Sequence, residues 1–295
     1  MKIVLTGSLG NVSRPLAEIL IRAGHSVTII SSDPGKREQI HALGARAAIG
    51  SVTDAGFMEP VFAGADAVYT MVPPDFTAQD PLTHYRKVAS AYAEALTGSG
   101  VKKIVHLSSW GADLPSGTGY ILGSHFAEGI LDRVPGSRVT HLRAGFIYYN
   151  LFHFVDMIRA TGMIAANYGE EDRIVMVSPA DIAAAAAEEL RLGSDGKGIR
   201  YVASDDRRAS EVASVLGGSI GKPDLQWKRL TDDQQRQRME SRKVPRHVIE
   251  NTLQLGQNIH NGNLRRHFDQ TAPHVFGKIK LEDFAREFAL IYNKV

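Results

Sequence analysis

The sequence contains no cysteine. A disulfide, a thiolate nucleophile, an iron–sulfur cluster and a cysteine-based zinc site are therefore all excluded. Long apolar runs are also lacking, since none approaches the about 20 residues that a membrane-spanning helix needs. The opening segment, Met1–Gly7, meets a glycine too early to be a signal peptide. We therefore expect a cytoplasmic protein with no membrane partner.

An excess of either charge is missing as well. Lys plus Arg total 34 and Asp plus Glu total 32, so the formal net charge is only +2. Nucleic-acid-binding proteins usually have a strong basic excess, so we expect no nucleic-acid partner. Apolar residues make up 43% of the chain and charged residues 22%, which is typical of a packed globular protein.

The 11 histidines do not form a metal-binding pattern. There is no His-Glu-x-x-His motif, and no two histidines stand four residues apart. His260, His267 and His274 recur every seven residues, but Pro273 breaks the helix that would align them. We expect no metal site.

Short apolar runs alternate with helical patterns over the first two-thirds of the chain. This alternation predicts βαβ units and an α/β fold with a doubly wound, parallel Rossmann sheet. After Gly145 the pattern weakens, and helices are expected at 181–192, 209–216 and 281–292. The expected strands of the first part are 3–5, 27–30, 67–71, 103–107 and 139–142, and its expected helices are 15–23, 36–43, 84–96 and 126–132.

A glycine-rich segment follows the first expected strand and opens the first expected helix. Gly7 permits a tight turn, Gly10 lets the backbone approach a pyrophosphate, and Ser13 is small enough for close helix–strand packing. The helix N-terminus offers free N–H groups and a partial positive charge to that anion. The segment therefore predicts a dinucleotide site, whose cofactor-binding residues are Thr6, Gly7, Leu9, Gly10, Asn11 and Val12.

The end of the second expected strand bears on the choice of cofactor. An Asp or Glu at this position accepts hydrogen bonds from the ribose of NAD. This strand ends in Ser31 and Ser32, with Asp33 next and Lys36 close behind. Hydroxyls followed by a cation suit a 2′-phosphate, so we expect NADP. NAD stays open as the alternative, with Asp33 turned towards the ribose.

Taken together, these motifs resemble the NmrA-like branch of the atypical short-chain dehydrogenase/reductase superfamily. The resemblance extends over nearly the whole chain and depends on the order and spacing of its motifs. They are the Thr-Gly-x-x-Gly loop at 6–10 and the segments 50–54, 64–68, 105–109, 142–146, 177–183 and 271–284.

The resemblance implies a Rossmann domain with a small α/β C-terminal lobe and NAD(P) at the carboxyl ends of the strands. The expected nucleotide-binding domain is 1–150, to which 174–203 returns, and 151–295 is mostly a substrate lid. By carry-over, Ser51 and Val52 flank the adenine. The expected cofactor contacts further along the chain are Met71, Val72, Pro73, Ser108, Gly145 and Phe146.

The catalytic residues of the resembled superfamily are only partly present. There, a Ser holds the substrate oxygen, a Tyr transfers a proton, and a Lys four residues later lowers the pKa of the Tyr. Here Ser108 stands at the right strand end, but Tyr120 is followed four residues later by Ser124. His125 is the alternative acid or substrate ligand. The catalytic candidates are therefore Ser108, Tyr120 and His125, and purely structural roles for the last two stay open.

Two functions are compatible with these residues. An NAD(P)H-dependent oxidoreductase acting on a flat or hydrophobic acceptor, such as a quinone, needs mainly cofactor positioning, and the resembled family includes quinone reductases without the Tyr–Lys pair. A non-catalytic NAD(P)-binding redox sensor also occurs in that family. We favour the reductase with a small-molecule substrate. A homodimer and a monomer are equally compatible with the sequence.

Overall fold

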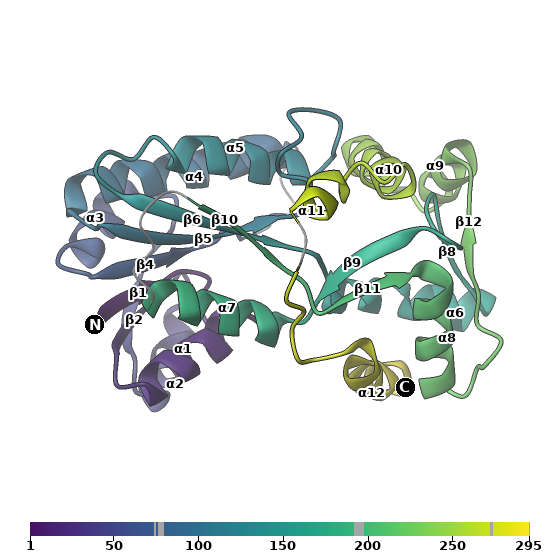
Figure 1. Cartoon of the computed structure of the whole chain (residues 1–295), viewed down its shortest axis with the longest axis horizontal. Coiled ribbons are helices and arrows are strands. Elements are labelled where there is room, and N and C mark those ends of the chain that lie inside the picture. The colour runs from purple at the N-terminus through teal and green to yellow at the C-terminus, as the bar shows by residue number, and fades with distance from the viewer. Residues whose placement is uncertain (74, 76–79, 192–197, 272–273, 295) are drawn as a thin grey trace. The chain divides into compact units, whose positions relative to one another are not determined.

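The computed structural model describes residues 1–73, 75, 80–191, 198–271 and 274–294 (Figure 1). Leu192, where a helix was expected to end, and Pro273 lie outside the described residues. The chain divides into two compact units. Unit 1 comprises Met1–Ser109, Gly123–Arg143 and Ile182–Arg200, and unit 2 comprises Trp110–Leu122, Ala144–Asp181 and Tyr201–Val295.

A seven-stranded sheet is built mostly from unit 1. Its strand order is β10-β6-β5-β4-β1-β2-β3, and β1 pairs in parallel with both β2 and β4. The chain order therefore reverses at β1 and β4, which is where doubly wound sheets bind ligands. This is the parallel Rossmann-like sheet that the sequence predicts. Its strands are β1 (Lys2–Leu5), β2 (Ser26–Ser31), β3 (Arg46–Ile49), β4 (Ala67–Thr70), β5 (Lys103–Ser109), β6 (Arg138–Ala144) and β10 (Gly198–Val202).

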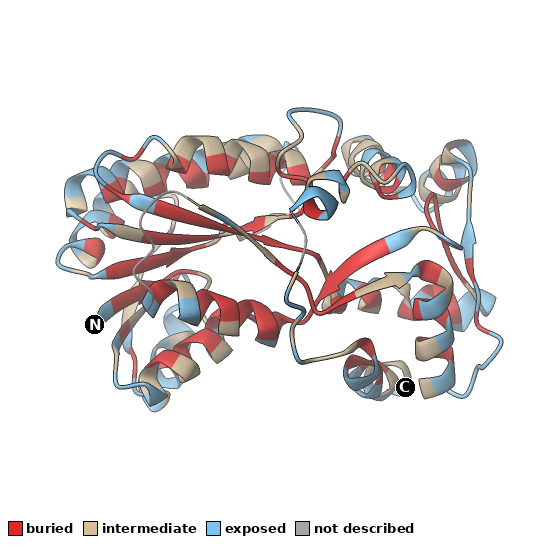
Figure 2. Cartoon of the chain, in the orientation of Figure 1, coloured by how far each residue is buried: buried red, intermediate tan, exposed pale blue. Residues whose placement is uncertain are grey.

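Helices flank this sheet on both faces, with α3, α4 and α5 above it and α1, α2 and α7 below it in Figure 1. Their inward sides are buried, as Figure 2 shows. In α1, for example, Leu16, Ala17 and Leu20 are fully buried, the spacing of an amphipathic helix. The flanking elements are α1 (Ser13–Arg22), the 3₁₀ helix η1 (Pro34–Lys36), α2 (Arg37–Ala42), α3 (Ala55–Phe62), α4 (Pro81–Ser99), α5 (Ile121–Leu131) and α7 (Pro179–Arg191).

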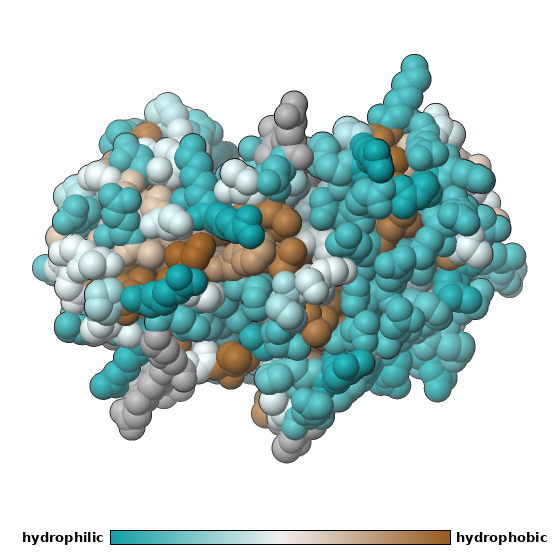
Figure 3. Space-filling model, turned by 90° about the horizontal axis from the view of Figure 1, so that it is seen from above, coloured by the Kyte–Doolittle hydropathy of each residue, from teal (hydrophilic) through white to brown (hydrophobic). Residues whose placement is uncertain are grey.

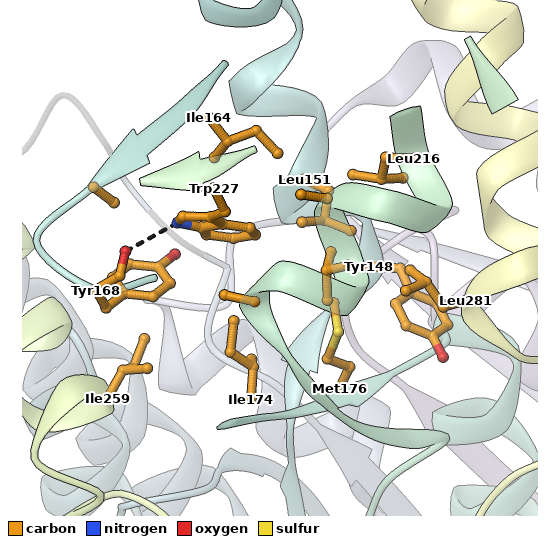
Figure 4. Close-up of a cluster of buried hydrophobic side chains, with 14 of the residues drawn as sticks. Tyr148, Leu151, Ile164, Tyr168, Ile174, Met176, Leu216, Trp227, Ile259 and Leu281 are labelled. Carbon is orange, nitrogen blue, oxygen red and sulfur yellow. Dashed lines mark hydrogen bonds between the residues drawn. The ribbon is translucent and has the colours of Figure 1, made fainter. Parts of the chain in front are cut away.

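Unit 2 has two smaller sheets and its own core. The sheet β11-β9-β7 comprises β7 (Phe146–Ile147), β9 (Arg173–Val177) and β11 (Asp205–Arg208), and the second pairs β8 (Ile164–Ala166) with β12 (Trp227–Arg229). In the core, the indole N–H of Trp227 donates to the carbonyl of Tyr168 (2.9 Å; Figure 4). The other elements are η2 (Tyr148–Phe154), α6 (Val155–Thr161), α8 (Ala209–Ser219), α9 (Asp232–Ser241), α10 (Arg246–His260), α11 (Arg266–Gln270) and α12 (Leu281–Tyr292).

Across the described ranges, no helix is long and apolar enough to span a membrane.

Candidate functional site

The glycine-rich loop is fixed to the sheet through Thr6, which is fully buried. Its backbone N–H donates to the carbonyl of Tyr69 in β4 (3.0 Å), and its hydroxyl oxygen accepts from the N–H of Met71 (3.0 Å). On the other side, the hydroxyl of Ser13 donates to the carbonyl of Thr6 (2.8 Å). The start of the loop is therefore held both by the end of β4 and by the first residue of α1.

The loop turns at Gly7, whose φ of +88° lies in the left-handed region. A Cβ at this position would lie 2.5 Å from the hydroxyl oxygen of Ser13. Gly10 closes the turn by donating its N–H to the carbonyl of Gly7 (3.1 Å), and a Cβ there would lie 3.0 Å from the same oxygen. The two glycines thus leave the backbone without side chains where the turn is tightest, which suits close approach by a diphosphate.

Helix α1 starts directly after this turn and carries no side-chain cap within the described structure. Val12 precedes it, and its first turn holds no acidic residue. Leu9 is half-buried and Asn11 is exposed beside it. The N–H of Arg14 already donates to the carbonyl of Gly10 (3.0 Å), and Pro15 has no N–H, so this helix start attracts an anion mainly through the positive end of the helix dipole. The loop and α1 together can therefore hold the diphosphate of a dinucleotide.

The end of β2 is linked to the same loop. Ser31 is buried, and its hydroxyl oxygen accepts from the hydroxyl of Ser8 (2.8 Å). The exposed Asp33 accepts from the N–H of Gly35 through Oδ1 (2.8 Å) and so caps η1. Its carboxylate therefore already stabilises the turn that carries the half-buried Lys36. Ser32, the other hydroxyl expected at this edge, is exposed.

The ends of β3 and β4 place further predicted contacts at the carboxyl edge of the sheet. After β3, the hydroxyls of Ser51 and Thr53 are 2.8 Å apart and exposed, and Val52 is half-buried between them. After β4, the carbonyl of Met71 accepts from the hydroxyl of Tyr92 in α4 (2.8 Å). Both segments are thus fixed by hydrogen bonds of their own.

Two other predicted contacts follow Met71. Val72 is buried, and Pro73 is half-buried with its carbonyl oxygen 2.8 Å from Nε2 of His84. Since β4 lies next to β1, these residues follow the strand that anchors the glycine-rich loop.

Ser108 lies near the end of β5 and is buried in a charged hydrogen-bond network. Its hydroxyl donates to Oε1 of Glu128 in α5 (2.5 Å). Glu128 also accepts two hydrogen bonds from the guanidinium of Arg143 in β6, at 3.0 and 2.7 Å. All three side chains are less than a tenth exposed. The hydroxyl of Ser108 therefore donates its proton to the hydrogen bond with Glu128. Towards any other group, its oxygen can act only as an acceptor.

Tyr120 lies directly before α5 and is half-buried. Burial raises the pKa of its phenol, which weakens it as a proton donor near neutral pH. Four residues later stands the buried hydroxyl of Ser124, where a lysine would lower that pKa.

His125 lies on α5 beside Phe126, with the two ring centroids 5.8 Å apart. It lines a hollow whose other residues come from α4, α5 and the turn after α5. Helix α5 thus directs Glu128 towards β5 and β6, and His125 towards α4. The glycine-rich loop contributes no residue to this hollow.

Gly145 and Phe146, the last predicted cofactor contacts, belong to unit 2. The N–H of Gly145 donates to the carbonyl of Val202 (3.1 Å), and a Cβ at Gly145 would lie 2.6 Å from the carbonyl oxygen of Val175. Phe146 pairs with Met176 in β9 and packs against the core of unit 2. The backbone of Val175 in β9 therefore lies too close to position 145 for any residue other than glycine.

Each of the three histidines that recur every seven residues has a different hydrogen-bond partner. His260 lies 3.0 Å from Asp172, His267 lies 2.9 Å from the hydroxyl of Tyr201, and the ring of His274 stacks on a phenylalanine. No group of three or more His, Asp or Glu side chains in the described ranges is arranged to hold a metal ion.

The main feature of the site that the sequence did not predict is the pair of residues that hold Ser108, namely Glu128 and Arg143. Glu128 and Arg143 both lie in motifs of the resembled family, but their meeting depends on the register of α5 against β5 and β6. The signals in the sequence were an acid in an otherwise apolar helix and an arginine at the end of an apolar strand.

A family profile described as NAD(P)H-binding matches residues 7–193. The chain belongs to the NAD(P)H-binding family. This match confirms the resemblance to the NmrA-like, atypical short-chain dehydrogenase/reductase group. It starts at Gly7, in the loop described above, and extends through β5, α5 and β6. No curated protein matches the sequence.

Solved structures share the fold at low identity. An NADPH-dependent quinone oxidoreductase from Escherichia coli, complexed with NADPH, is 18% identical with a TM-score of 0.76, covering 97% of this chain and 99% of that one. The Citrobacter sp. triphenylmethane reductase complexed with NADP(H) is 16% identical with a TM-score of 0.79, covering 98% and 100%. A UDP-glucose 4-epimerase from Bifidobacterium longum, in complex with NAD⁺ and UDP, is 15% identical with a TM-score of 0.68, covering 100% and 98%.

Proposed function

We propose that this NAD(P)H-binding protein is a reductase for a small flat or hydrophobic acceptor, with a quinone as the representative substrate. The bound nicotinamide would supply the hydride. The observation that carries the proposal is the hydrogen bond from Ser108 to Glu128, since it withdraws the hydroxyl proton that would otherwise polarise a substrate carbonyl. With Ser124 in place of the lysine, an acceptor that needs little proton assistance suits this chain.

NADPH is the donor that we propose. Strand β2 ends at Ser31 and is followed by Ser32, and Asp33 already caps η1, whose last residue is Lys36. A hydroxyl-and-cation edge fits a 2′-phosphate better than a bare ribose. In support, the quinone oxidoreductase and the triphenylmethane reductase were solved in complex with NADPH and NADP(H), although the epimerase was solved with NAD⁺.

The same hydrogen bond also favours a second candidate, a non-catalytic sensor of the NADPH/NADP⁺ ratio. A protein that binds the cofactor but lacks a substrate-directed donor would retain affinity without turnover. Comparing limited proteolysis with NADPH and with NADP⁺ tests this function, because a sensor must adopt different conformations with the two forms.

The deciding experiment is a turnover assay of the purified protein. NADPH oxidation is followed by absorbance with a panel of quinones and simple aldehydes, after binding of NADPH has been measured by calorimetry. We expect quinone reduction, little aldehyde reduction, and less than about a tenfold fall in kcat for Tyr120→Phe, since a proton-transfer residue contributes about 10²–10⁴-fold. Tight binding of NADPH with no oxidation across the panel would exclude the reductase and favour the sensor.

A further inference from the structure

A hollow of about 260 Å³ lies on the outer side of α4 and α5, entirely within unit 1. Figure 3 views the side of the molecule that carries these helices, where a band of hydrophobic residues is bordered by strongly hydrophilic ones. The hollow is lined by Arg86, Ser90, His125, Phe126, Gly129, Ile130 and Arg133.

The charged groups that line the hollow are all basic. Arg86 stacks over the ring of Phe126, with its guanidinium carbon 3.8 Å from the ring centroid. Arg133 folds back over its own helix, where its Nε–H donates to the carbonyl of Gly129 (2.8 Å). Both guanidinium groups are thus positioned by contacts that leave their charge uncompensated.

Within the described part of the chain, neither arginine forms an ion pair with a carboxylate. Asp80, before α4, feels the charge of Arg86 only weakly, since its pKa is lowered chiefly by the hydroxyl of Thr83. Other arginines of the molecule, such as Arg200 with its two glutamates, are paired. Two unpaired, pre-oriented guanidinium groups beside a hydroxyl donor form a recognition pattern for an anion.

We propose that this hollow binds a phosphate group, either free phosphate or the phosphate of a small monoester. Paired guanidinium donors match the several acceptor oxygens and double charge of phosphate, and the hydroxyl of Ser90 adds a neutral donor. The apolar side chains of Phe126 and Ile130 can contact the carbon part of a monoester. The volume is at or below the lower end of the range for drug-sized ligands, about 300 Å³, so a dinucleotide does not fit.

This site is distinct from the nucleotide loop, because no residue of the loop or of the strand ends described above lines it. It shares only α5 with the Ser108 network. Its occupancy therefore does not depend on the proposed reductase function, and each can fail without the other.

The test is calorimetric titration of the whole protein with inorganic phosphate, and separately with phenyl phosphate, in a phosphate-free buffer of low ionic strength. NADP⁺ is kept saturating, so that phosphate cannot report on the nucleotide loop. The double variant Arg86→Gln/Arg133→Gln removes both guanidinium groups. Arg22→Gln, on the exposed end of α1, is the matched control for loss of a positive charge.

We expect binding by the wild type and by Arg22→Gln, and at least a tenfold loss of affinity in the double variant. Ser90→Glu is a second, single-site variant, which should abolish binding by placing a carboxylate in the hollow. In NMR spectra, the ring signals of His125, assigned with His125→Gln, should shift on phosphate addition. Phosphate that binds the double variant as tightly as the wild type, or no binding by the wild type at millimolar phosphate, would overturn the proposal.

Discussion

The hydroxyl of Ser108 donates a 2.5 Å hydrogen bond to the carboxylate of Glu128, which is itself paired with the buried guanidinium of Arg143. The network joins β5, α5 and β6 beneath the surface of unit 1. Ser108 therefore acts first as a structural donor in this arrangement. Any role towards a substrate would use its oxygen as an acceptor or would require the hydrogen bond to break.

Removing either end of this network should have very different effects on stability. Glu128→Ala removes the carboxylate that pairs with the buried guanidinium of Arg143 and should lower the free energy of unfolding by about 3–5 kcal/mol. Ser108→Ala loses one hydrogen bond and should cost about 1 kcal/mol. Urea unfolding measures both. Glu18→Ala breaks the exposed pair with Arg14 and is the control, with an expected loss of about 0.5 kcal/mol or less. Equal losses at Glu128 and Glu18 would contradict the buried network.

Gly7 and Gly24 provide a matched pair for the nucleotide loop, since both have φ in the left-handed region, at +88° and +81°. Gly24→Ala meets no atom within 4 Å and should cost only backbone strain, about 1 kcal/mol. Gly7→Ala also brings its Cβ against Ser13 and should displace the loop. We expect at least a tenfold loss of NADPH affinity by calorimetry for Gly7→Ala alone. Unchanged affinity would argue against the loop as the diphosphate site.

Lys36 should determine the preference for NADPH over NADH. If its ammonium group pairs with the 2′-phosphate, Lys36→Ala loses a charge-assisted hydrogen bond, which is about tenfold or more in affinity. NADH affinity should hardly change, because NADH has no group for that charge. The measurement is the ratio of the two dissociation constants, with Lys87→Ala on the exposed side of α4 as the control. A parallel loss for both cofactors would place Lys36 away from the 2′-phosphate.

The sequence was sufficient to predict a parallel sheet and five of its seven strands, β1, β2, β4, β5 and β6, because these are short apolar runs of the kind expected for buried β-strands. Strands β3 and β10 were not among those expected. Strand β11 could not be predicted from an apolar run. It reads Asp-Asp-Arg-Arg over Asp205–Arg208, with no apolar residue, and exists because it pairs with the buried β9. Helix α3 was also missed, since Pro60 stands inside it. Strand pairing thus overrides local propensity at β11, and burial of Met58 and Phe62 does so at α3.

In the candidate site, the sequence predicted the contiguous loop but not the contacts between separate elements. The loop at 6–13 is contiguous, so its motif alone locates it. The helix expected at 36–43 is α2, whereas the 3₁₀ turn η1 before it, which Asp33 caps by accepting from the N–H of Gly35, was not expected. The contact between Ser108 and Glu128 joins residues 20 positions apart, and it depends on how α5 packs on the sheet. Side-chain partners across elements cannot be read from local spacing.

A buried histidine makes the stability of unit 1 depend on pH. His106 lies in β5 with Nδ1 2.9 Å from the hydroxyl of Thr70, and its ring meets that of His141 edge-on at 5.7 Å. Burial, assisted by His141, lowers the pKa of His106 to about 3 from the ordinary 6.5. The folded state therefore holds this imidazole neutral, whereas the unfolded chain protonates it below about pH 6.5.

The sign of the dependence follows from which state binds the proton. Between about pH 6.5 and 3 the unfolded state binds more protons at this residue, so acidification should lower the free energy of unfolding by up to about 1.4 kcal/mol per pH unit. His106→Gln removes this contribution while keeping a polar partner for Thr70, and the exposed His153→Gln is the control. Urea unfolding at a series of pH values should give a shallower slope for His106→Gln than for the wild type or His153→Gln. Equal slopes in all three would mean that the pKa of His106 is the same in the folded and unfolded states.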